Sequence, residues 1–403
     1  WVVMHKITIL DCTLRDGEQA PGVFFTHKEK LAIADLLDAA GVGMIDAGMP
    51  SVSEDERATL RALCERGYRA VVAGTVRALN HDIDLAIDCG LSDVFLFMPV
   101  SPQHLRHKFG MTLQQVRPKI EAAVEYAVAR GLRVHFVAED TVRSNIKELA
   151  PILDQVTDLG AASIMICDTV GVMLPNQLQS FIETLAERLS SEVELGIHCH
   201  NDYGLATANT IAAVGAGCTI VSGTINGLGE RAGNAALEEV VCALENLCGL
   251  DVGIKKPVLM KLCEKVARAS GVFVMPTKPV SGLNVFRHES GVHVDGMLKD
   301  LSTYESINPV TLGREHEFVL GKHGGTGLIE KLLAGRNIYT SHETLLRILE
   351  RVKRAKVERD KAEFDVVGNM LDRFWARHLS FSEEEFWQIA MRELALDIDA
   401  SVA

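Results

Sequence analysis

Two short polar segments stand out in this chain because each directly follows an apolar run. The first is Asp11–Gln19, which follows Ile7–Leu10 and contains Arg15 and Asp16. The second is His198–Asp202, with the order His-Cys-His-Asn-Asp. Charged groups rarely lie at the end of a buried strand unless they are paired or bind a ligand. We therefore expect the two segments to meet at one ligand site.

The residue types in these segments indicate a metal ion. His198 and His200 lie two positions apart at the end of a strand, so both side chains point to the same face. Two such imidazoles can bind one divalent cation. Two histidines at this spacing with no further ligand, however, more often have a structural role. A carboxylate from Asp16 would complete the site and favours the metal, and Asn234 could add an oxygen. Nitrogen and oxygen ligands suit Mn²⁺, Zn²⁺, Mg²⁺ or Co²⁺ without selecting one.

The glycine-rich segments do not carry the nucleotide motifs that they resemble at first sight. Gly227–Asn234 has the spacing GxGxxxG, whereas dinucleotide-binding loops have GxGxxG. We expect a tight turn that presents Asn234. Gly321–Gly325 does not match the phosphate-binding loop pattern, and we assign no nucleotide to it.

The elements that must position these residues follow an alternating pattern. Short apolar runs alternate with amphipathic helical segments up to about residue 250, and polar residues end nearly every apolar run. Eight such units predict an α/β fold of the (β/α)8 TIM-barrel type, and the polar strand ends favour the barrel over a doubly wound sheet. The predicted strands are Ile7–Asp11, Met44–Ala47, Ala70–Gly74, Val94–Met98, Val134–Ala138, Ser163–Cys167, Glu194–His198 and Thr219–Thr224.

The rest of the chain has a different composition. We expect a catalytic barrel over residues 1–270, an ordered linking subdomain over 271–330 that contributes active-site residues, and a small helical C-terminal domain over 331–403. Residues 276–328 are rich in Gly, Pro, His and Ser and show weak periodicity. Beyond them, Thr340 with Glu343 and Ser382 with Glu385 are spaced as capping boxes, which predicts two helix starts.

Composition limits the function classes. The net charge of −13 argues against nucleic-acid binding, and no apolar run reaches the ~20 residues of a membrane span. Lys6 and Asp11 interrupt the first apolar stretch, which argues against a signal peptide. Nine cysteines without a CxxC pair suit free thiols in a reducing compartment. We expect a cytoplasmic enzyme without nucleic-acid or membrane partners.

Several motifs together resemble one enzyme family, that of the homocitrate synthases and 2-isopropylmalate synthases. The resemblance covers about residues 5–330, and the joint occurrence of five motifs makes it specific. Three further segments are most similar to the nitrogen-fixation type of homocitrate synthase: Leu205–Thr210, Asn234–Glu239 and Val292–Gly296. The five motifs are Leu14–Gln19, His198–Asp202, Gly227–Asn234, His288–His293 and Ser302–Glu305.

The resemblance implies a Claisen condensation. Acetyl-CoA, the co-substrate, would lose a methyl proton and attack the ketone of a 2-oxo acid, and the thioester would then be hydrolysed. One divalent metal ion at Asp16, His198 and His200 would polarise that ketone. Arg15 would stabilise the developing alkoxide. The resemblance assigns substrate binding to Thr169 and Gln19.

By the same resemblance, His293 is the base that removes the methyl proton, and Glu139 and Tyr304 form its network. A base near neutrality suits this step, and histidine is the usual choice. Since His293 and Tyr304 lie beyond the barrel sequence, we expect them to reach its mouth from the linking region. We expect a homodimer, in which a neighbouring subunit is one source of these residues, as in the domain-swapped dimers of the family.

The acceptor is the least constrained part of the prediction. His135 occupies the position at which lysine-pathway homocitrate synthases carry an arginine. Strand alternation places His135 on the same face as Glu139, and Arg77 ends a nearby strand, so together they could bind a distal acidic group. The alternative is a packed His135 and an Arg77 paired with a neighbouring carboxylate.

We expect 2-oxoglutarate as the acceptor, with the phosphonomethylmalate or 2-isopropylmalate type of alkylmalate synthase as the alternative. A lyase of the 3-hydroxy-3-methylglutaryl-CoA type is less favoured, because such lyases carry a cysteine where this chain has Glu230-Arg231. A catalytically silent scaffold barrel is disfavoured because the residues assigned to the chemistry are all present.

Overall fold

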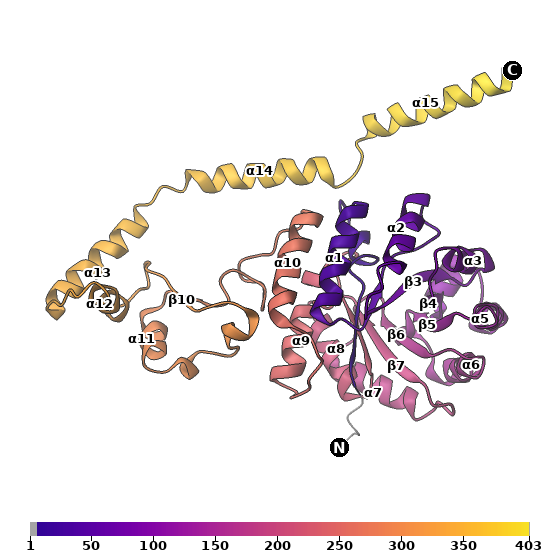
Figure 1. Ribbon diagram of the computed structural model, residues 1–403, viewed down its shortest axis with the longest axis horizontal. Coiled ribbons are helices and arrows are strands. Elements are labelled where there is room, and N and C mark those ends of the chain that lie inside the picture. Colours follow the sequence, from indigo (N-terminus) through magenta and orange to yellow (C-terminus); the bar gives the residue numbers. More distant parts are fainter. Residues whose placement is uncertain (1–5, 403) are drawn as a thin grey trace. The chain divides into compact units, whose positions relative to one another are not determined.

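The computed structural model describes residues 6–402, and the side chains of residues 6–394. The chain forms two compact units (Figure 1). The first comprises the residues up to 20, residues 24–285 and residues 311–313, and the second comprises residues 21–23, 286–310 and 314 onward. The predicted three-part division at residues 270 and 330 stays a prediction.

The first unit is a closed barrel of eight parallel strands, each hydrogen-bonded to the next, with β8 paired to β1. This confirms the predicted TIM barrel and excludes the doubly wound sheet. All eight predicted strands are present, and the largest difference is at β3, which continues to Arg77. The strands are β1 (Thr8–Asp11), β2 (Met44–Asp46), β3 (Val71–Arg77), β4 (Asp93–Pro99), β5 (Arg133–Glu139), β6 (Ser163–Asp168), β7 (Glu194–Cys199) and β8 (Ile220–Gly223).

Helices follow the strands and cover the outside of the barrel (Figure 1). Side chains cap the first turns of α1, α2, α4, α5 and α6; at α1, Thr26 and Glu29 form a capping box. The helices of this unit are α1 (His27–Ala40), α2 (Glu54–Cys64), α3 (Asn80–Asp88), α4 (Pro102–His104), α5 (Leu113–Val128), α6 (Ile146–Asp158), α7 (Pro175–Ala186), α8 (Ala206–Gly215), α9 (Leu237–Asn246) and α10 (Lys256–Ser270).

The barrel interior is filled by inward-pointing apolar side chains. Because side chains alternate along a strand, every second residue of each strand faces inward. Leu10 of β1, Phe95 of β4, Met165 of β6 and Ile220 of β8 belong to one buried cluster. The interior is therefore a packed core, and the strand ends above it are free to carry polar groups.

The second unit begins with a small sheet and continues as helices. Strand β9 (Arg287–His288) pairs in parallel with β10 (Glu317–Phe318). The helices are α11 (Gly291–Lys299), α12 (Thr326–Ala334), α13 (His342–Val357), α14 (Ala362–His378) and α15 (Glu383–Val402). Helices α12 and α13 pack through a small core of Ile329, Leu345 and Leu349.

The two predicted capping boxes have different outcomes. Ser382 and Glu385 exchange backbone and side-chain hydrogen bonds ahead of α15, which confirms that prediction. The cap of α13 is Ser341, whose hydroxyl accepts from the Thr344 amide, so the predicted pair of Thr340 and Glu343 was wrong by one residue.

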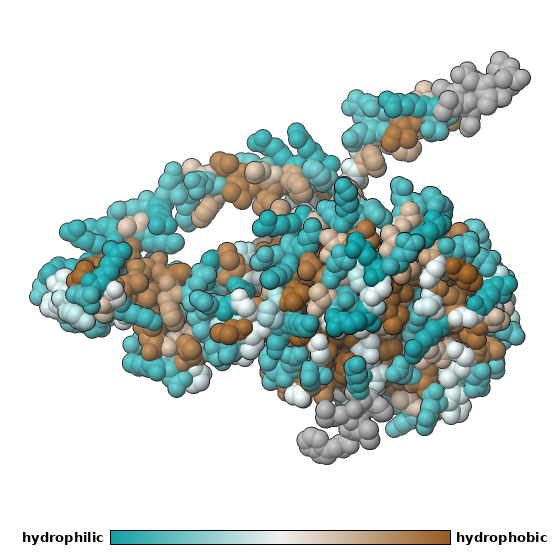
Figure 2. All heavy atoms as spheres, in the orientation of Figure 1, coloured by the Kyte–Doolittle hydropathy of each residue, from teal (hydrophilic) through white to brown (hydrophobic). Residues whose placement is uncertain are grey.

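Helix α14 exposes apolar side chains along its length (Figure 2). Phe364, Val367 and Met370 are each more than half exposed. In residues 6–402, no helix has both the length and the apolar composition that crossing a membrane requires.

Candidate metal centre and acceptor cavity

A cavity of about 280 Å³ opens at the carboxyl ends of the barrel strands. Barrel enzymes build their active sites at this end. Side chains from the predicted site and from the barrel core line it together. The lining residues are Leu10, Cys12, Arg15, Asp16, Gln19, Asp46, Met49, Thr75, Phe95, Phe97, Val137, Glu139, Met165, Cys167, Thr169, His198, His200, Ser222, Glu230 and Arg231.

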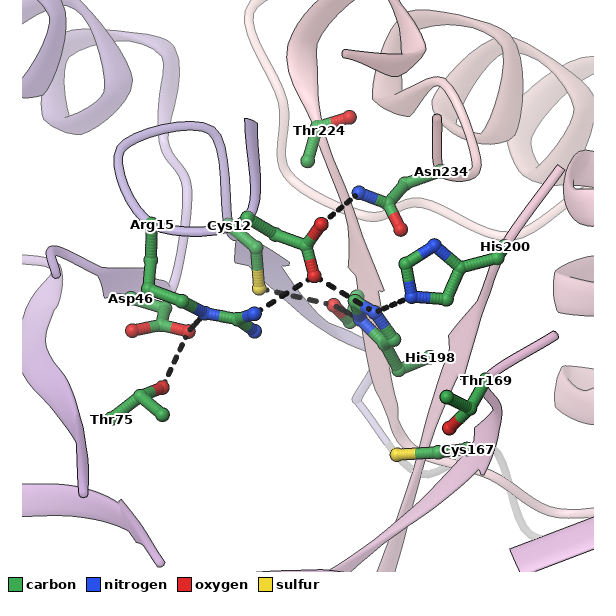
Figure 3. Close-up of polar contacts among 12 residues, drawn as sticks. Cys12, Arg15, Asp46, Thr75, Cys167, Thr169, His198, His200, Thr224 and Asn234 are labelled. Atoms are coloured by element: carbon green, nitrogen blue, oxygen red, sulfur yellow. Dashed lines mark hydrogen bonds and ion pairs between the residues drawn. The ribbon is translucent and has the colours of Figure 1, made fainter. Parts of the chain in front are cut away.

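The two polar segments meet in this cavity (Figure 3). The Nε2 atoms of His198 and His200 lie 3.3 Å apart, and the Oδ2 of Asp16 lies 3.3 Å from the Nε2 of His198. One ligand atom from each of the three buried residues lies within 4.8 Å of the others. Ser222 contacts the other ring nitrogen of His198, Nδ1, at 2.9 Å. This contact leaves Nε2 to face the cluster. In metal-binding histidines, the ring nitrogen that does not bind the metal usually has such a hydrogen-bond partner.

The glycine-rich turn brings a fourth polar group to the cluster. Asn234 forms an isolated antiparallel bridge with His200, and its Nδ2 donates to Asp16 Oδ1 at 3.0 Å. The Oδ1 of Asn234 is buried and has no hydrogen-bond partner among the described residues. The turn needs its glycines: a Cβ on Gly229 would lie 2.3 Å from the Asn234 amide nitrogen. An orphaned amide oxygen beside two imidazoles and a carboxylate fits a divalent cation.

The electrostatics of the cluster keep its ligand atoms unprotonated. Burial, with the neighbouring His198, lowers the pKa of His200 from 6.5 to about 4, so the imidazole is neutral near pH 7. Burial acts to raise the pKa of Asp16, but Arg15 and the contact with His198 hold it well below 3.8. Neutral imidazoles and an ionised carboxylate are the forms that bind metals.

Arg15 lies between two buried carboxylates. Its Nη1 donates to Asp16 Oδ2 at 2.8 Å and its Nε donates to Asp46 Oδ2 at 2.7 Å. The hydroxyl of Thr75 donates to the same Asp46 oxygen at 2.9 Å. The guanidinium is therefore fixed beside the cluster of Asp16, His198 and His200, and Figure 3 shows this arrangement.

Two residues that the resemblance assigns to substrate binding also line the cavity. Gln19 is exposed at the rim. Thr169 follows β6, and its hydroxyl oxygen accepts from the backbone N–H of Asp140 at 2.9 Å. That contact uses a lone pair, so the hydroxyl hydrogen of Thr169 is still able to donate.

Glu139 ends β5 at the cavity wall. Lys108 contacts its Oε1 at 2.5 Å and His104 Nδ1 lies 3.1 Å from the same oxygen. Lys108 belongs to the π-helical turn Leu105–Phe109, a geometry that is frequent at functional sites. The Oε2 of Glu139 is buried and has no hydrogen-bond partner in the described part of the chain.

His293 and Tyr304 belong to the second unit and lie against each other. Their ring centroids are 4.1 Å apart with planes inclined by 31°. Tyr304 is 45% exposed, and His293 is exposed. The pair packs beside Gly296, where a Cβ would lie 3.2 Å from Tyr304 Cε2. The structure therefore brings two of the three predicted members of the base network together.

Arg77 and His135, the predicted partners of a distal acidic group, have the contacts of the alternative arrangement in this structure. Arg77 is half exposed and forms a bidentate pair with Asp82 at 2.6 and 2.8 Å. His135 does face the barrel interior, but its ring nitrogens contact Ser163 at 2.7 Å and Asp93 at 3.2 Å. Neither Arg77 nor His135 is among the described residues that line the cavity.

Sequence reasoning missed the residues that support and shape the site. Asp46 was visible only as a polar residue at the end of a strand, and Thr75 only as a residue near the end of another. Phe95, Phe97 and Met165 were part of apolar runs, and no sequence signal separates a cavity wall from core.

The chain matches two family models. The first is described as HMGL-like and matches residues 6–266. The second is described as a homocitrate synthase post-HMGL domain-like model and matches residues 280–360.

Curated relatives and a solved structure give a consistent assignment. The homocitrate synthase AksA of Methanopyrus kandleri is 42% identical over 91% of this chain and 93% of its own length. The 2-isopropylmalate synthase of Sulfurisphaera tokodaii is 42% identical over 90% of this chain and 94% of its own. The Bacillus subtilis HMG-CoA lyase has a TM-score of 0.61 at 21% identity, covering 68% of this chain and 96% of the lyase, which shows a shared fold.

Proposed function

Because this chain belongs to the HMGL-like family, within the homocitrate synthases and 2-isopropylmalate synthases, we propose that it is an acyltransferase that condenses acetyl-CoA with a 2-oxo acid. The acyl group becomes an alkyl group when its methyl carbon forms the new bond. Hydrolysis of the thioester then releases CoA and a 2-hydroxy-2-alkyl dicarboxylic acid.

The observation that carries this proposal is the cluster of Asp16, His198 and His200 beside the unpartnered oxygen of Asn234. We propose that these residues hold one divalent cation. The ion would supply Lewis-acid chemistry, polarising the ketone of a chelated 2-oxo acid. The hydroxyl of Thr169 would donate to the carboxylate of the same substrate, and Gln19 would support it from the rim.

Arg15 suits the charge that develops during condensation. The reaction turns the ketone oxygen into an alkoxide, and a fixed cation beside that oxygen stabilises it without reorganisation. The contacts of Arg15 with Asp16 and Asp46 hold the guanidinium in place before the substrate binds. Removal of one such preorganised donor costs about 10²–10³ in kcat in other enzymes.

We assign proton abstraction to His293, supported by Tyr304 and Glu139. His293 would take a proton from the acetyl methyl group, and the resulting carbanion equivalent would attack the ketone carbon. General-base catalysis typically contributes about 10²–10⁴-fold. The close, tilted contact between the rings of His293 and Tyr304 supports a common role for the two side chains.

The cavity lining favours an acceptor with an uncharged side chain. The expectation of 2-oxoglutarate came from the resemblance to homocitrate synthases, with Arg77 and His135 as the partners of its distal carboxylate, and these two residues do not line the cavity. The arginines that line the cavity in the described part of the chain are Arg15 and Arg231, and each already contacts a carboxylate. The walls that remain include Leu10, Phe95, Phe97, Val137 and Met165.

A second carboxylate on the acceptor would lose hydration against these apolar walls without gaining a cationic partner. We therefore propose 2-oxo acids with a short uncharged alkyl side chain, the class of 2-oxoisovalerate. A loss of about 1–3 kcal/mol for the unpaired carboxylate predicts about 5- to 150-fold discrimination.

The test is a thiol assay of CoA release from acetyl-CoA with added Mn²⁺. The acceptors are pyruvate, 2-oxobutyrate, 2-oxoisovalerate and 2-oxoglutarate. We expect kcat/KM for 2-oxoisovalerate to exceed that for 2-oxoglutarate at least about fivefold. A preference for 2-oxoglutarate would overturn the acceptor assignment. No CoA release with any acceptor would overturn the reaction class.

We further propose a homodimer. The more than half-exposed apolar side chains of Phe364, Val367 and Met370 along α14 support an interface with a second copy (Figure 2). Light scattering coupled to size-exclusion chromatography measures the mass directly. A monomer at micromolar concentration would contradict this proposal.

A further inference from the structure

A chain of three polar side chains lies in the second unit and is not used by the proposed chemistry. His316 Nε2 lies 2.8 Å from Glu305 Oε2, and His316 Nδ1 lies 3.3 Å from His288 Nε2. The side chains of His316 and Glu305 are 11% and 21% exposed. These contacts join three positions that are far apart in the sequence of this unit.

The direction of the hydrogen bonds follows from the chemistry of the groups. An ionised carboxylate can only accept, so His316 Nε2–H donates to Glu305. In a neutral imidazole the other nitrogen then accepts, so His288 Nε2–H donates to His316 Nδ1. Burial, with the neighbouring His316 and His293, lowers the pKa of His288, in agreement with its neutral form.

Aromatic side chains surround this chain of hydrogen bonds. The ring of His316 meets Phe286 edge-on at 6.0 Å between centroids, and the ring of His288 lies 5.9 Å from Phe318. Arg314 covers the face of Phe286 at 4.8 Å. Apolar surroundings strengthen hydrogen bonds and exclude competing water, so these contacts constrain the backbone around them.

Two of the three residues, Glu305 and His288, lie close in the sequence to the residues assigned to proton abstraction. Glu305 follows Tyr304 immediately, at the end of the turn Leu301–Thr303. Two residues separate His288, the last residue of β9, from α11, the helix that carries His293. The hydrogen bonds through His316 therefore tie the segment that bears the tyrosine to the segment that bears the histidine.

We propose that Glu305, His316 and His288 are positioning residues that hold His293 against Tyr304 in the geometry needed for proton abstraction. This inference rests on the proposed function. The three side chains act through the backbone and do not themselves take the proton. Loss of the link therefore impairs the deprotonation step, while the metal cluster of the barrel and its acceptor stay intact.

The first experiment compares His316→Ala with Glu317→Ala in the full-length protein. Glu317 is the matched control, because it lies in the same sheet and pairs with Arg287 at 2.7 Å, outside the three-residue chain. We expect His316→Ala to lower kcat and methyl-proton exchange of acetyl-CoA by about 10–100-fold. KM for the 2-oxo acid and the bound metal content should stay within twofold. Glu317→Ala should leave all four quantities within twofold.

A second pair of variants separates positioning from folding. A glutamine amide oxygen can accept from His316 Nε2–H, so Glu305→Gln keeps the link whereas Glu305→Ala breaks it. We expect Glu305→Gln to retain at least half of kcat and Glu305→Ala to lose as much as His316→Ala. Equal loss in the two Glu305 variants, or kcat within twofold in Glu305→Ala, would overturn the inference. An inactive parent enzyme would instead overturn the proposed function.

Discussion

The sharpest test of the site is the replacement of Asp46 by asparagine. Asp46 is 1% exposed, and its Oδ2 accepts from both Arg15 and Thr75. Asparagine has nearly the same shape and keeps a carbonyl oxygen for both donors, so the change removes the negative charge and little else. If Arg15 stabilises the alkoxide, the loss of its anchor should appear as slower turnover.

The expected decrease in kcat follows from the strength of the weakened hydrogen bond between Arg15 and Asp46. A hydrogen bond to a charged group contributes about 1.5–3 kcal/mol, and Arg15 keeps its second contact with Asp16. The neutral asparagine oxygen keeps a weaker hydrogen bond of about 0.5–1.5 kcal/mol, so about 1–1.5 kcal/mol is lost. At about 1.4 kcal/mol for each factor of ten, Asp46→Asn should lower kcat by about 5- to 10-fold. Since the charge on the alkoxide appears only during the reaction, KM for the 2-oxo acid should change by less than about threefold.

The assay measures CoA release at saturating acetyl-CoA across a range of acceptor concentrations. Asp82→Asn is the matched control, because Asp82 is also 1% exposed and pairs with an arginine, but its partner Arg77 does not line the cavity. That control should keep kcat within twofold. Equal losses in the two variants, or an unchanged kcat in Asp46→Asn, would refute the role assigned to Arg15.

Three further predictions follow from the structure. His200→Ala should lose bound metal and at least about 100-fold of activity together, by elemental analysis and CoA release, whereas the exposed His81→Ala should lose neither. Arg77→Ala should leave KM for every acceptor within twofold, because Arg77 pairs with an aspartate outside the cavity; a selective rise for 2-oxoglutarate would restore the acidic-acceptor assignment. Burial raises the pKa of Asp11 from 3.8 to about 7, so its protonated form stabilises the fold at low pH and this contribution is lost as pH rises from 3.8 to 7. Relative to the parent, the free energy of unfolding of Asp11→Asn, measured in urea, should therefore rise by about 4 kcal/mol between pH 4 and pH 8. Parallel pH profiles of the two proteins would contradict this.

Most of the fold was predictable because its signals are local. Each strand of a barrel is buried on both faces and appears as a short apolar run, and each helix has a separate periodicity. The prediction Val94–Met98 differs from β4 by one residue at each end. The start of α13 was predicted one residue too early because Thr340 and Ser341 are both good N-cap residues. Only the backbone geometry selects Ser341.

The meeting of Asp16, His198 and His200 was predictable from the same topology. In a parallel barrel all strands end at one rim, so polar residues that end β1 and β7 had to come close together. The partners of Arg15 could not be predicted in this way. Several acidic residues end strands at the same rim, and only the register of β2 against β1 and β3 brings Asp46 to the guanidinium. Such register is a tertiary property that a single sequence does not display.

The position of Arg77 shows why charge at a strand end is a weak guide to specificity. Alternation along β3 gives Arg77 the same parity as Thr75, which does line the cavity. Asp82, however, lies only five residues after Arg77, in the first turn of α3. A bidentate ion pair between residues so close in the sequence costs little chain entropy. Arg77 therefore pairs with the nearby carboxylate of Asp82 and does not point into the cavity. The apolar wall of the cavity, which includes Phe95 and Phe97 of β4, is then left to discriminate between acceptors. We therefore expect acceptor selectivity to change more with side-chain volume at this wall than with charge at the rim.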